Sequence, residues 1–391
     1  PPAALAPSDD ADSLALPIPV STADDRGQLE AHLAAGVQAG ASDIHLHAGG
    51  PVKQRVNGEL VVMQEGIDAA TIERIVVSAL SPEQQQVLRD RGEIDFCFDL
   101  PGTGRFRANA YRQQRGLDAV FRSIPDRPPT VEELNLPEDL KKYTDYHQGM
   151  VLVTGSTGTG KSTTLAAMID HLNETRNLNI ISLEDPIEFV HPSKQSQVIQ
   201  REVGTHVVSF ADGVRSAMRE DPDVILVGEL RDAETISMAM TAAETGHLVL
   251  GTLHTTGAVK TIDRIIDALP GELREQTKGF LAMSLKAVVT QVLVKTPDGR
   301  GRRAILEILV NTRAIAKLIT TDQTHQIATQ LQTGKNLGMQ VMDQALLDAI
   351  DAKEIDPDDA IRYANEKKKF QRLVTNTDMF PTIEIGDGSK V

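Results

Sequence analysis

The spacing of apolar residues changes in character part-way along the chain. Up to about residue 123, short segments alternate apolar and polar positions, as in strands with one buried face, and two longer segments repeat apolar residues at helical spacing. The predicted helices cover residues 27–41 and 72–89. The predicted strands cover residues 44–47, 52–56, 60–63, 94–98, 106–111 and 119–122, with a hairpin turn at Asn57-Gly58. This part is predicted to be an α+β domain.

Uninterrupted apolar runs dominate the second part of the chain. They cover residues 150–154, 179–183, 224–227 and 247–252 and alternate with long helical segments. Strands without alternating polar positions are typical of a parallel sheet covered by helices on both faces. A final hairpin, residues 291–295 and 304–310, leads into a helical tail. The fold class is therefore predicted to be α/β.

Composition predicts the boundaries of these parts. Residues 1–25 are rich in Pro, Ala, Ser and Asp and are predicted to be a disordered leader, because they offer little apolar surface to bury. The prolines within residues 125–129 predict a linker, since proline resists both helix and central strand. The predicted organisation is a leader 1–25, a domain 26–124, a linker 125–135, a domain 136–370 and a mobile tail 371–391.

Charge and cysteine content exclude several classes of protein. The 391 residues have a net charge of −15, four Tyr, nine Phe and no Trp. An acidic chain with few aromatic side chains is a poor binder of single-stranded nucleic acid. The single Cys excludes an internal disulfide and any site that needs two Cys ligands, and it fits a reducing cytosol. Neither a membrane-spanning stretch nor a signal peptide is predicted.

A phosphate-binding loop is the strongest chemical signal. Residues 155–162 match the pattern G-x-x-x-x-G-K-[ST] and lie between a predicted strand and a predicted helix. Backbone N–H groups of such a loop converge on phosphate oxygens at a helix N-terminus, the lysine contacts the β- and γ-phosphates, and the following hydroxyl binds Mg²⁺. The predicted nucleotide-binding residues are Gly155, Ser156, Thr157, Gly158, Thr159, Gly160, Lys161, Ser162 and Thr163.

Carboxylates follow two of the predicted parallel strands. Glu184 ends one apolar run, and Glu229 follows the next. Ligands of open parallel sheets bind at the carboxyl ends of the strands, so these two acids are candidates for holding Mg²⁺ and for orienting water. A single acid in a loop is more often simply solvated, but two at equivalent strand ends beyond a P-loop favour function.

Histidines and arginines give weaker signals. His247 and His254 bracket one apolar strand at an odd spacing that disfavours a shared metal site, and either could be structural or could contact the γ-phosphate. A metal role for His45 and His47 is also disfavoured. Five arginines cluster before the linker, either as a solvated strand face or as groups offered to a neighbouring subunit's phosphates: Arg105, Arg107, Arg112, Arg115 and Arg122.

Four linked motifs resemble those of bacterial secretion ATPases. Besides the P-loop, residues 184–188 (Glu-Asp-Pro-Ile-Glu) resemble their Asp box, residues 221–232 their Walker B segment, and residues 242–256 their His box. Together these motifs, in this order, resemble the type IV pilus retraction ATPases of the PilT and PilU type. The likeness covers roughly residues 27–365.

The resemblance implies a fold and a set of roles. Members are cytoplasmic homohexamers in which a PAS-like N-terminal domain precedes a RecA-like ATPase domain. By analogy Glu184 is the catalytic carboxylate, Glu229 the Walker B acid near Mg²⁺, and His254 a γ-phosphate neighbour, although the roles of the two acids could be reversed. Arg107 and Arg122 match arginines that reach the nucleotide.

The implied activity is Mg²⁺-ATP hydrolysis coupled to type IV pilus retraction, and hence twitching motility, at the inner-membrane base of the pilus. The implied partners are a platform protein and a paralogous retraction ATPase. Pilus-assembly and type II secretion ATPases usually carry a four-cysteine zinc module, which this chain lacks. Residues 314–321 keep the apolar frame of the retraction signature without its arginines, and residues 296–303 look closer to the PilU type. A sole motor and an accessory motor both stay open. A nucleic-acid motor is disfavoured by the charge.

Overall fold

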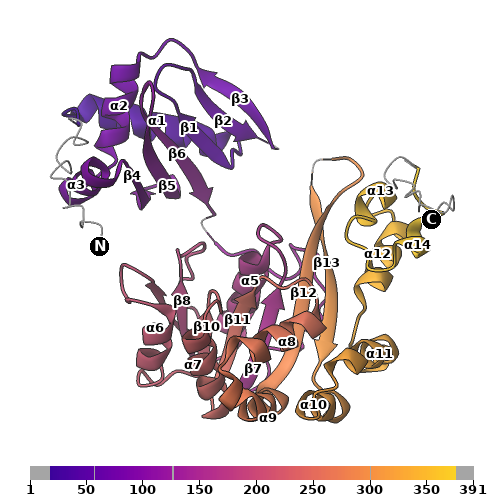
Figure 1. Cartoon of the computed structure of the whole chain (residues 1–391). Helices are drawn as coiled ribbons and strands as arrows, with labels where there is room; N and C mark the ends of the chain where they lie inside the picture. Colours follow the sequence, from indigo (N-terminus) through magenta and orange to yellow (C-terminus); the bar gives the residue numbers. More distant parts are fainter. Residues whose placement is uncertain (1–17, 57, 126, 300, 376–391) are drawn as a thin grey trace, which may run out of the picture. The chain divides into compact units, whose positions relative to one another are not determined.

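The computed structural model describes residues 18–375 except 57, 126 and 300. The chain divides into two compact units, Pro1–Asp126 and Arg127–Val391. Each has its own sheet and its own apolar core (Figure 1). Among the described residues, none of the helices has the length and apolar character needed to cross a membrane.

An antiparallel sheet of six strands, in the order β3-β2-β1-β6-β5-β4, is the centre of the N-terminal unit. Its strands are β1 (Asp43–Leu46), β2 (Val52–Val56), β3 (Glu59–Gln64), β4 (Glu93–Leu100), β5 (Gly104–Gln113) and β6 (Gly116–Ile124). The helices are α1 (Ala23–Gln38), α2 (Ala69–Ser78) and α3 (Pro82–Arg91). Apolar side chains of the helices and of one sheet face form a single core. This agrees with the predicted α+β domain, while its PAS-like character stays a prediction.

Two predicted boundaries in this unit need correction, the end of the leader and the extent of the second helix. The leader was predicted to extend to residue 25, but α1 begins at Ala23, because Thr22 and Asp25 form a capping box. The single helix predicted for residues 72–89 is two helices, since Ser81 caps a new helix that has Pro82 in its first turn. Residues 1–17 of the predicted leader lie outside the described residues.

The second unit is built on a sheet of seven strands in the order β13-β12-β7-β11-β10-β8-β9. Its strands are β7 (Gly149–Thr154), β8 (Asn179–Glu184), β9 (Gln197–Glu202), β10 (Val224–Val227), β11 (Leu248–Leu253), β12 (Leu285–Lys295) and β13 (Arg302–Val310). All neighbours pair in parallel except β12 and β13. The predicted parallel sheet and final hairpin are confirmed. The strand β9 was not predicted.

Helices cover both faces of this sheet (Figure 1). One core includes residues of α4 (Asp139–Lys142) and α5 (Lys161–Thr175). The other includes residues of α6 (Phe210–Ala217), α7 (Ala233–Glu244), α8 (Ala258–Ala268), α9 (Arg274–Ser284), α10 (Arg313–Thr320) and α11 (Ile327–Thr333). A third cluster joins β12 and β13 to α12 (Met342–Asp351), α13 (Pro357–Ala360) and α14 (Lys367–Phe370). The predicted helical tail is therefore packed on the sheet.

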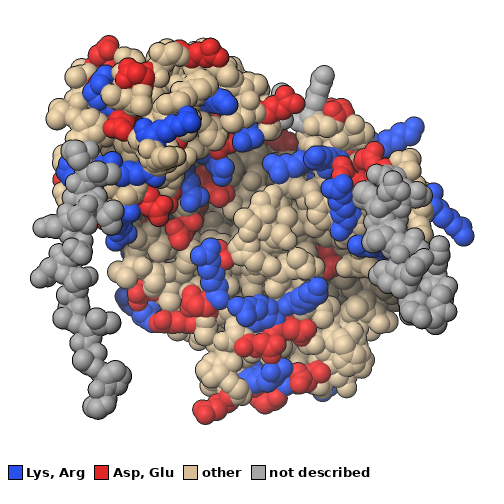
Figure 2. Space-filling view, turned by 45° about the horizontal axis from the view of Figure 1, so that its top comes forward, with Lys and Arg blue, Asp and Glu red and all other residues tan. Residues whose placement is uncertain are grey.

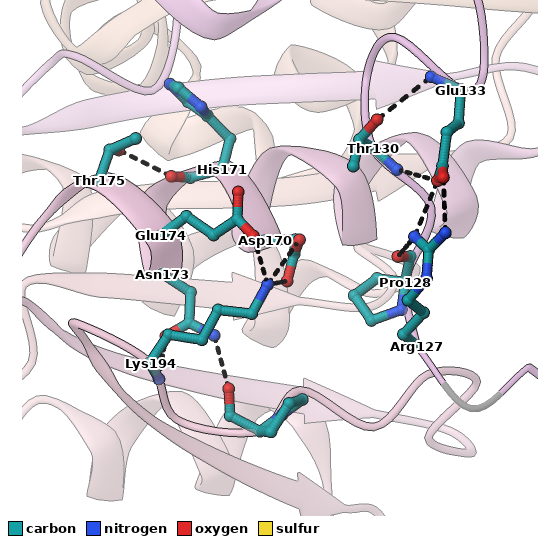
Figure 3. Close-up of polar contacts among 11 residues, drawn as sticks. Arg127, Pro128, Thr130, Glu133, Asp170, His171, Asn173, Glu174, Thr175 and Lys194 are labelled. Carbon is teal, nitrogen blue, oxygen red and sulfur yellow. Dashed lines mark hydrogen bonds and ion pairs between the residues drawn. The ribbon is translucent and has the colours of Figure 1, made fainter.

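The predicted linker is shorter than residues 125–135. Val131 is 1% exposed and belongs to the core of the second unit. Arg127 forms two hydrogen bonds with the Glu133 carboxylate, which lowers the pKa of Glu133 to about 2 (Figure 3). The segment after residue 126 is therefore part of the second unit. Of the predicted tail, residues 376–391 lie outside the described residues, and Thr375 donates a hydrogen bond to Asp358.

Candidate active site

The motif loops meet at one edge of the parallel sheet. The P-loop follows β7, His254 follows β11, Glu229 lies just beyond β10, and Glu184 is the last residue of β8. Because these four strands are consecutive in the sheet, their carboxyl ends lie side by side. The candidate residues of four segments that are separate in the sequence thus lie on a single edge of the sheet.

Glycines shape the P-loop. Gly155 has φ of +146°, and a Cβ at this position would lie 2.4 Å from the carbonyl oxygen of Gln291. Gly160 caps α5 in the left-handed region with φ of +83°. Only glycine adopts such conformations at little cost, so the loop turns tightly into the helix. The first turn of α5 then begins with Lys161 and Ser162, which presents helix N–H groups toward the edge of the sheet.

The Lys161 ammonium lies within the P-loop. Its Nζ donates to the carbonyl oxygens of Gly155 at 2.9 Å and Ser156 at 3.1 Å. Burial lowers the pKa of Lys161, whereas the charges of Glu229 and Glu188 act in the opposite direction. A lysine in contact with loop carbonyls and close to acidic groups is placed to bind phosphate charge.

Gln291 supports the P-loop from the neighbouring strand, and the sequence analysis missed this role. This residue of β12 is 2% exposed. Its Nε2 donates to the Thr159 carbonyl at 2.6 Å, and its Oε1 accepts from the Thr164 hydroxyl at 2.7 Å. The amide therefore ties the loop and the first turns of α5 to the sheet. A polar residue inside an apolar strand was the available signal.

His254 connects the P-loop with the carboxylate after β10. Its Nε2 lies 3.0 Å from Glu229 Oε1, and its Nδ1 lies 3.3 Å from the Thr157 hydroxyl. An ionised carboxylate only accepts hydrogen bonds, so Nε2 carries a proton in this arrangement. His247, in contrast, bonds through Nδ1 to the Ala242 carbonyl at 2.9 Å, as expected for a structural histidine.

Glu229 contacts an arginine and a histidine. Arg231 Nε lies 2.5 Å from Glu229 Oε1, and His254 approaches the same oxygen. Burial alone would raise the pKa of Glu229, but the Arg231 hydrogen bond and the nearby charges of His254 and Arg231 lower it. Glu229 is therefore held as a carboxylate. An ionised oxygen donor of this kind suits a hard cation such as Mg²⁺.

Glu184 has a different environment. Its Oε1 accepts the Ser182 hydroxyl at 2.6 Å and the Gln200 amide at 2.9 Å. Burial raises the pKa of Glu184, and these two hydrogen bonds, with a third from the Glu188 backbone N–H, only partly oppose that effect. The charge of Glu188 raises it further. A carboxylate with a raised pKa and neutral donors has the properties of a general base.

The loop after Glu184 is anchored on the P-loop helix. Lys194 Nζ contacts both carboxylate oxygens of Asp170, at 2.8 and 3.0 Å, and Glu174 at 2.8 Å (Figure 3). Asn173 donates to the Pro192 carbonyl at 2.7 Å and accepts the Lys194 N–H at 2.9 Å. These contacts come from α5, so the segment that carries the Asp box is tied to the helix that follows the P-loop.

The predicted arginines belong to the N-terminal unit. Arg107 on β5 and Arg122 on β6 are direct register partners and therefore lie on the same sheet face. Arg122 is 67% exposed, and its Nε donates to Asp43 at 2.8 Å. The neighbouring residues Phe106 and Phe121 point to the opposite face and are buried in the core. The open face thus presents two adjacent guanidinium groups.

His45 on β1 and His47 just after it belong to no metal cluster. His47 Nδ1 lies 2.6 Å from Asp118, and burial lowers the pKa of His45. Within residues 18–375, gaps at 57, 126 and 300 aside, no group of three or more His, Cys, Asp or Glu side chains is arranged to hold a metal ion. The candidate Mg²⁺ ligands fit a different pattern, because Ser162 and Glu229 supply only part of a coordination shell that phosphate oxygens and water complete.

A model of the family described as type II/IV secretion system protein matches residues 27–299. The chain belongs to this family. It is 48% identical over 315 residues to the type IV pilus retractation ATPase PilT of Pseudomonas aeruginosa, a match that covers 80% of this chain and 91% of that protein. The type IV pilus ATPase PilU of the same organism is 39% identical and covers 86% of this chain and 89% of its own length.

The fold also matches a solved relative. The structure titled as the pilus retraction motor PilT with bound ADP has a TM-score of 0.81 and 40% identity, and it covers 88% of this chain and 98% of that chain. These findings confirm the predicted likeness to the pilus retraction ATPases and the α/β fold with a P-loop ATPase domain. They also confirm that the chain is a nucleotide-binding ATPase of this family.

Proposed function

We propose that this chain is the motor ATPase of type IV pilus retraction and that it works as a homohexameric ring. The observation that carries the proposal is the meeting of four motif loops on adjacent parallel strands, in a chain that matches PilT over nearly its full length. The identity to PilT, 48%, also exceeds the 39% identity to PilU, which favours a retraction motor.

Each residue of the edge has a role in this proposal. P-loop amides and Lys161 bind the β- and γ-phosphates of ATP, and Ser162 and Glu229 hold the Mg²⁺ ion, directly or through water. The bound ion would neutralise phosphate charge. Glu184 orients the attacking water and takes up its proton. His254 lies beside the γ-phosphate and connects it with Glu229, because it already contacts both Thr157 and that carboxylate.

The open sheet face of the N-terminal unit completes a neighbour's site in the ring. Arg107 and Arg122 would stabilise charge that develops on the transferred phosphoryl group. This role is consistent with their exposure and with their placement side by side on a face that faces away from the core. A monomer would then hydrolyse ATP slowly, and ring formation would activate it.

The ring acts in the cytoplasm at the inner-membrane base of the pilus, where a platform protein is its partner. Lys and Arg are interspersed with Asp and Glu on the face shown in Figure 2, and the net charge is −15. Such a surface supports a protein partner better than nucleic acid. DNA-stimulated hydrolysis that weakens steeply with salt would instead support a nucleic-acid motor.

An accessory role of the PilU type is the second candidate. It is favoured by residues 314–321, Ala-Ile-Ala-Lys-Leu-Ile-Thr-Thr, which keep the apolar positions of the retraction signature without its arginines. In the structure Ile315 and Ile319 of this segment are fully buried within α10, whereas Lys317 lies on its accessible side. A paralogous retraction ATPase would then be a partner of this ring.

The test counts surface pili in cells that lack this chain and are complemented with the wild type or with Lys161→Ala. Excess pili and lost twitching, restored only by the wild type, are expected for a retraction motor. If the cells that lack this chain have excess pili and Lys161→Ala restores the normal number as the wild type does, the accessory candidate is supported. Cells without pili would indicate assembly and would contradict both.

A further inference from the structure

Gln200 joins three groups around the candidate catalytic carboxylate. Its Nε2 donates to Glu184 Oε1 at 2.9 Å and to the Phe189 carbonyl at 2.8 Å. Its Oε1 accepts the His191 N–H at 2.8 Å. Gln200 lies on β9, the edge strand that pairs with β8, and it is the register partner of Ser182, which also donates to Glu184.

The orientation of this amide is determined by its partners. The His191 N–H can only donate, so it requires the Gln200 oxygen, and the Phe189 carbonyl can only accept, so it requires the nitrogen. The amide nitrogen is therefore left with one further hydrogen, and it points to Glu184. Reversal of the amide would place two donors together and two acceptors together, and it would cost both loop contacts.

The loop that orients Gln200 is itself fixed at a second point. Phe189 and His191 are buried, and Lys194 further along the loop is paired with Asp170 of α5. The loop that follows Glu184 is thus held at two points, by Gln200 on β9 and by Asp170 on the helix that follows the P-loop. A displacement of this loop would reach the Glu184 carboxylate through the Gln200 amide.

We propose that Gln200 is a positioning residue for Glu184, which locks the carboxylate in the orientation that places water against the γ-phosphate. The proposal rests on the hydrolytic role proposed above for Glu184. Gln200 touches no reacting atom in this account and acts only through the carboxylate. A base misplaced by about 1 Å can lose about 100-fold in rate, while ATP binding depends on the P-loop and stays unchanged.

The test compares Gln200→Leu with Gln197→Leu in the full chain by steady-state ATP hydrolysis. Gln197 lies on the same strand and is exposed, and its side-chain amide donates to Asn179 Oδ1 at 3.3 Å. Gln200→Leu is expected to lower kcat about 10- to 100-fold with the KM for ATP within twofold, whereas Gln197→Leu keeps both. Wild-type kcat in Gln200→Leu, or an equal loss in Gln197→Leu, would overturn the proposal.

A double-mutant cycle separates positioning from a general structural effect. In a Glu184→Gln background, Gln200→Leu is expected to cost no further activity, because its effect passes through the missing carboxylate. An equal loss in both backgrounds would contradict the proposal. If Gln200→Leu does not fold, Gln200→Met keeps the length of the side chain and removes the donor to Glu184 without adding a charge, so the same kcat loss is expected from it.

The two proposals fail in different ways. Wild-type hydrolysis by Glu184→Gln would refute the role of Glu184 and with it the basis of the positioning proposal. An inactive Glu184→Gln together with a fully active Gln200→Leu would refute only the role of Gln200. Pilus counts affect neither result, because both are read from purified protein.

Discussion

Two neighbouring strand ends hold their carboxylates in opposite environments. At the end of β8, Glu184 accepts hydrogen bonds from the neutral groups of Ser182 and Gln200, and burial raises its pKa. Just beyond β10, Glu229 is paired with Arg231 and His254, and these contacts lower its pKa although burial opposes them. The strands that carry these two residues are direct neighbours in the sheet.

The difference favours the roles proposed for the two acids, Glu184 as the base and Glu229 at the metal, which the sequence analysis allowed to be reversed. A carboxylate with a lowered pKa is a poor base and a good partner for Mg²⁺. A partly buried carboxylate with a raised pKa takes up a proton more readily and is the better base. The local partners of each residue therefore support the two proposed functions more directly than its place in a motif does.

The largest expected effect comes from Glu184→Gln. The amide keeps the size of the side chain and removes the base, so kcat for ATP hydrolysis is expected to fall about 1,000-fold, with ATP affinity nearly unchanged. Steady-state hydrolysis and equilibrium nucleotide binding measure the two quantities. Glu220→Gln, which removes a surface partner of Arg201, is the control and should stay active. Substantial hydrolysis by Glu184→Gln would show that Glu184 is not the base.

Glu229→Gln is expected to weaken Mg²⁺ binding rather than to impair proton transfer. Loss of an ionised ligand should raise the Mg²⁺ concentration for half-maximal nucleotide binding about 10- to 100-fold. Titration of Mg²⁺ against a fixed amount of ATP analogue gives this value. Glu234→Gln, which removes a surface partner of Arg215, is the control and should keep the wild-type Mg²⁺ requirement. An unchanged Mg²⁺ requirement in Glu229→Gln would show that the ion is held elsewhere.

The pH dependence of hydrolysis should report the environment of Glu184. A base must be ionised, so activity is lost as pH falls through its pKa, and the raised pKa moves this loss above the ordinary carboxylate value of 4.5. Glu188→Gln removes a like charge that raises this pKa, and its acid limb is expected at lower pH. Initial rates of ATP hydrolysis from pH 4 to 8 give the acid limb of the wild type and that of Glu188→Gln. An acid limb that moves to higher pH in Glu188→Gln would contradict the assignment.

The smallest effect concerns the pH dependence of the free energy of unfolding, through His191 in the loop that follows Glu184. Burial lowers the pKa of His191 from 6.5 to about 4, so the folded state prefers the neutral ring. This contribution to stability is present above pH 6.5 and is lost as pH falls toward 4, by roughly 3 kcal/mol at most. Chemical denaturation at pH 7 and pH 5 should show a smaller acid-induced loss in His191→Gln than in the wild type. Equal losses in both would argue against a buried neutral His191.

Much of the fold could be predicted from the apolar pattern. Central strands such as β7 and β10 are fully buried, so their residues form uninterrupted apolar runs. The strand β9 escaped prediction because it lies at the sheet edge, and its residues, Gln-Val-Ile-Gln-Arg-Glu, are mostly polar. The break between α2 and α3 was signalled by Ser81 and Pro82, a cap and a first-turn proline that periodicity alone ignores.

The candidate site was predictable only in part. Glycine spacing identified the P-loop, and position after apolar strands identified Glu184 and Glu229. The supporting amides Gln200 and Gln291 were not predicted, because their roles depend on which strands become neighbours. Sequence order separates Gln291 from the P-loop by more than a hundred residues, and only the parallel pairing of β12 with β7 brings them together. The proposed arginine roles of Arg107 and Arg122 stay predictions.

The central claim is that the two carboxylates divide the work between proton transfer and metal binding. The most direct measurement is the rate of ATP hydrolysis by the wild type, Glu184→Gln and Glu229→Gln over a wide range of Mg²⁺ concentrations. The account predicts that excess Mg²⁺ restores much of the activity of Glu229→Gln and none of the activity of Glu184→Gln. Recovery of Glu184→Gln by Mg²⁺, with Glu229→Gln inactive throughout, would contradict it.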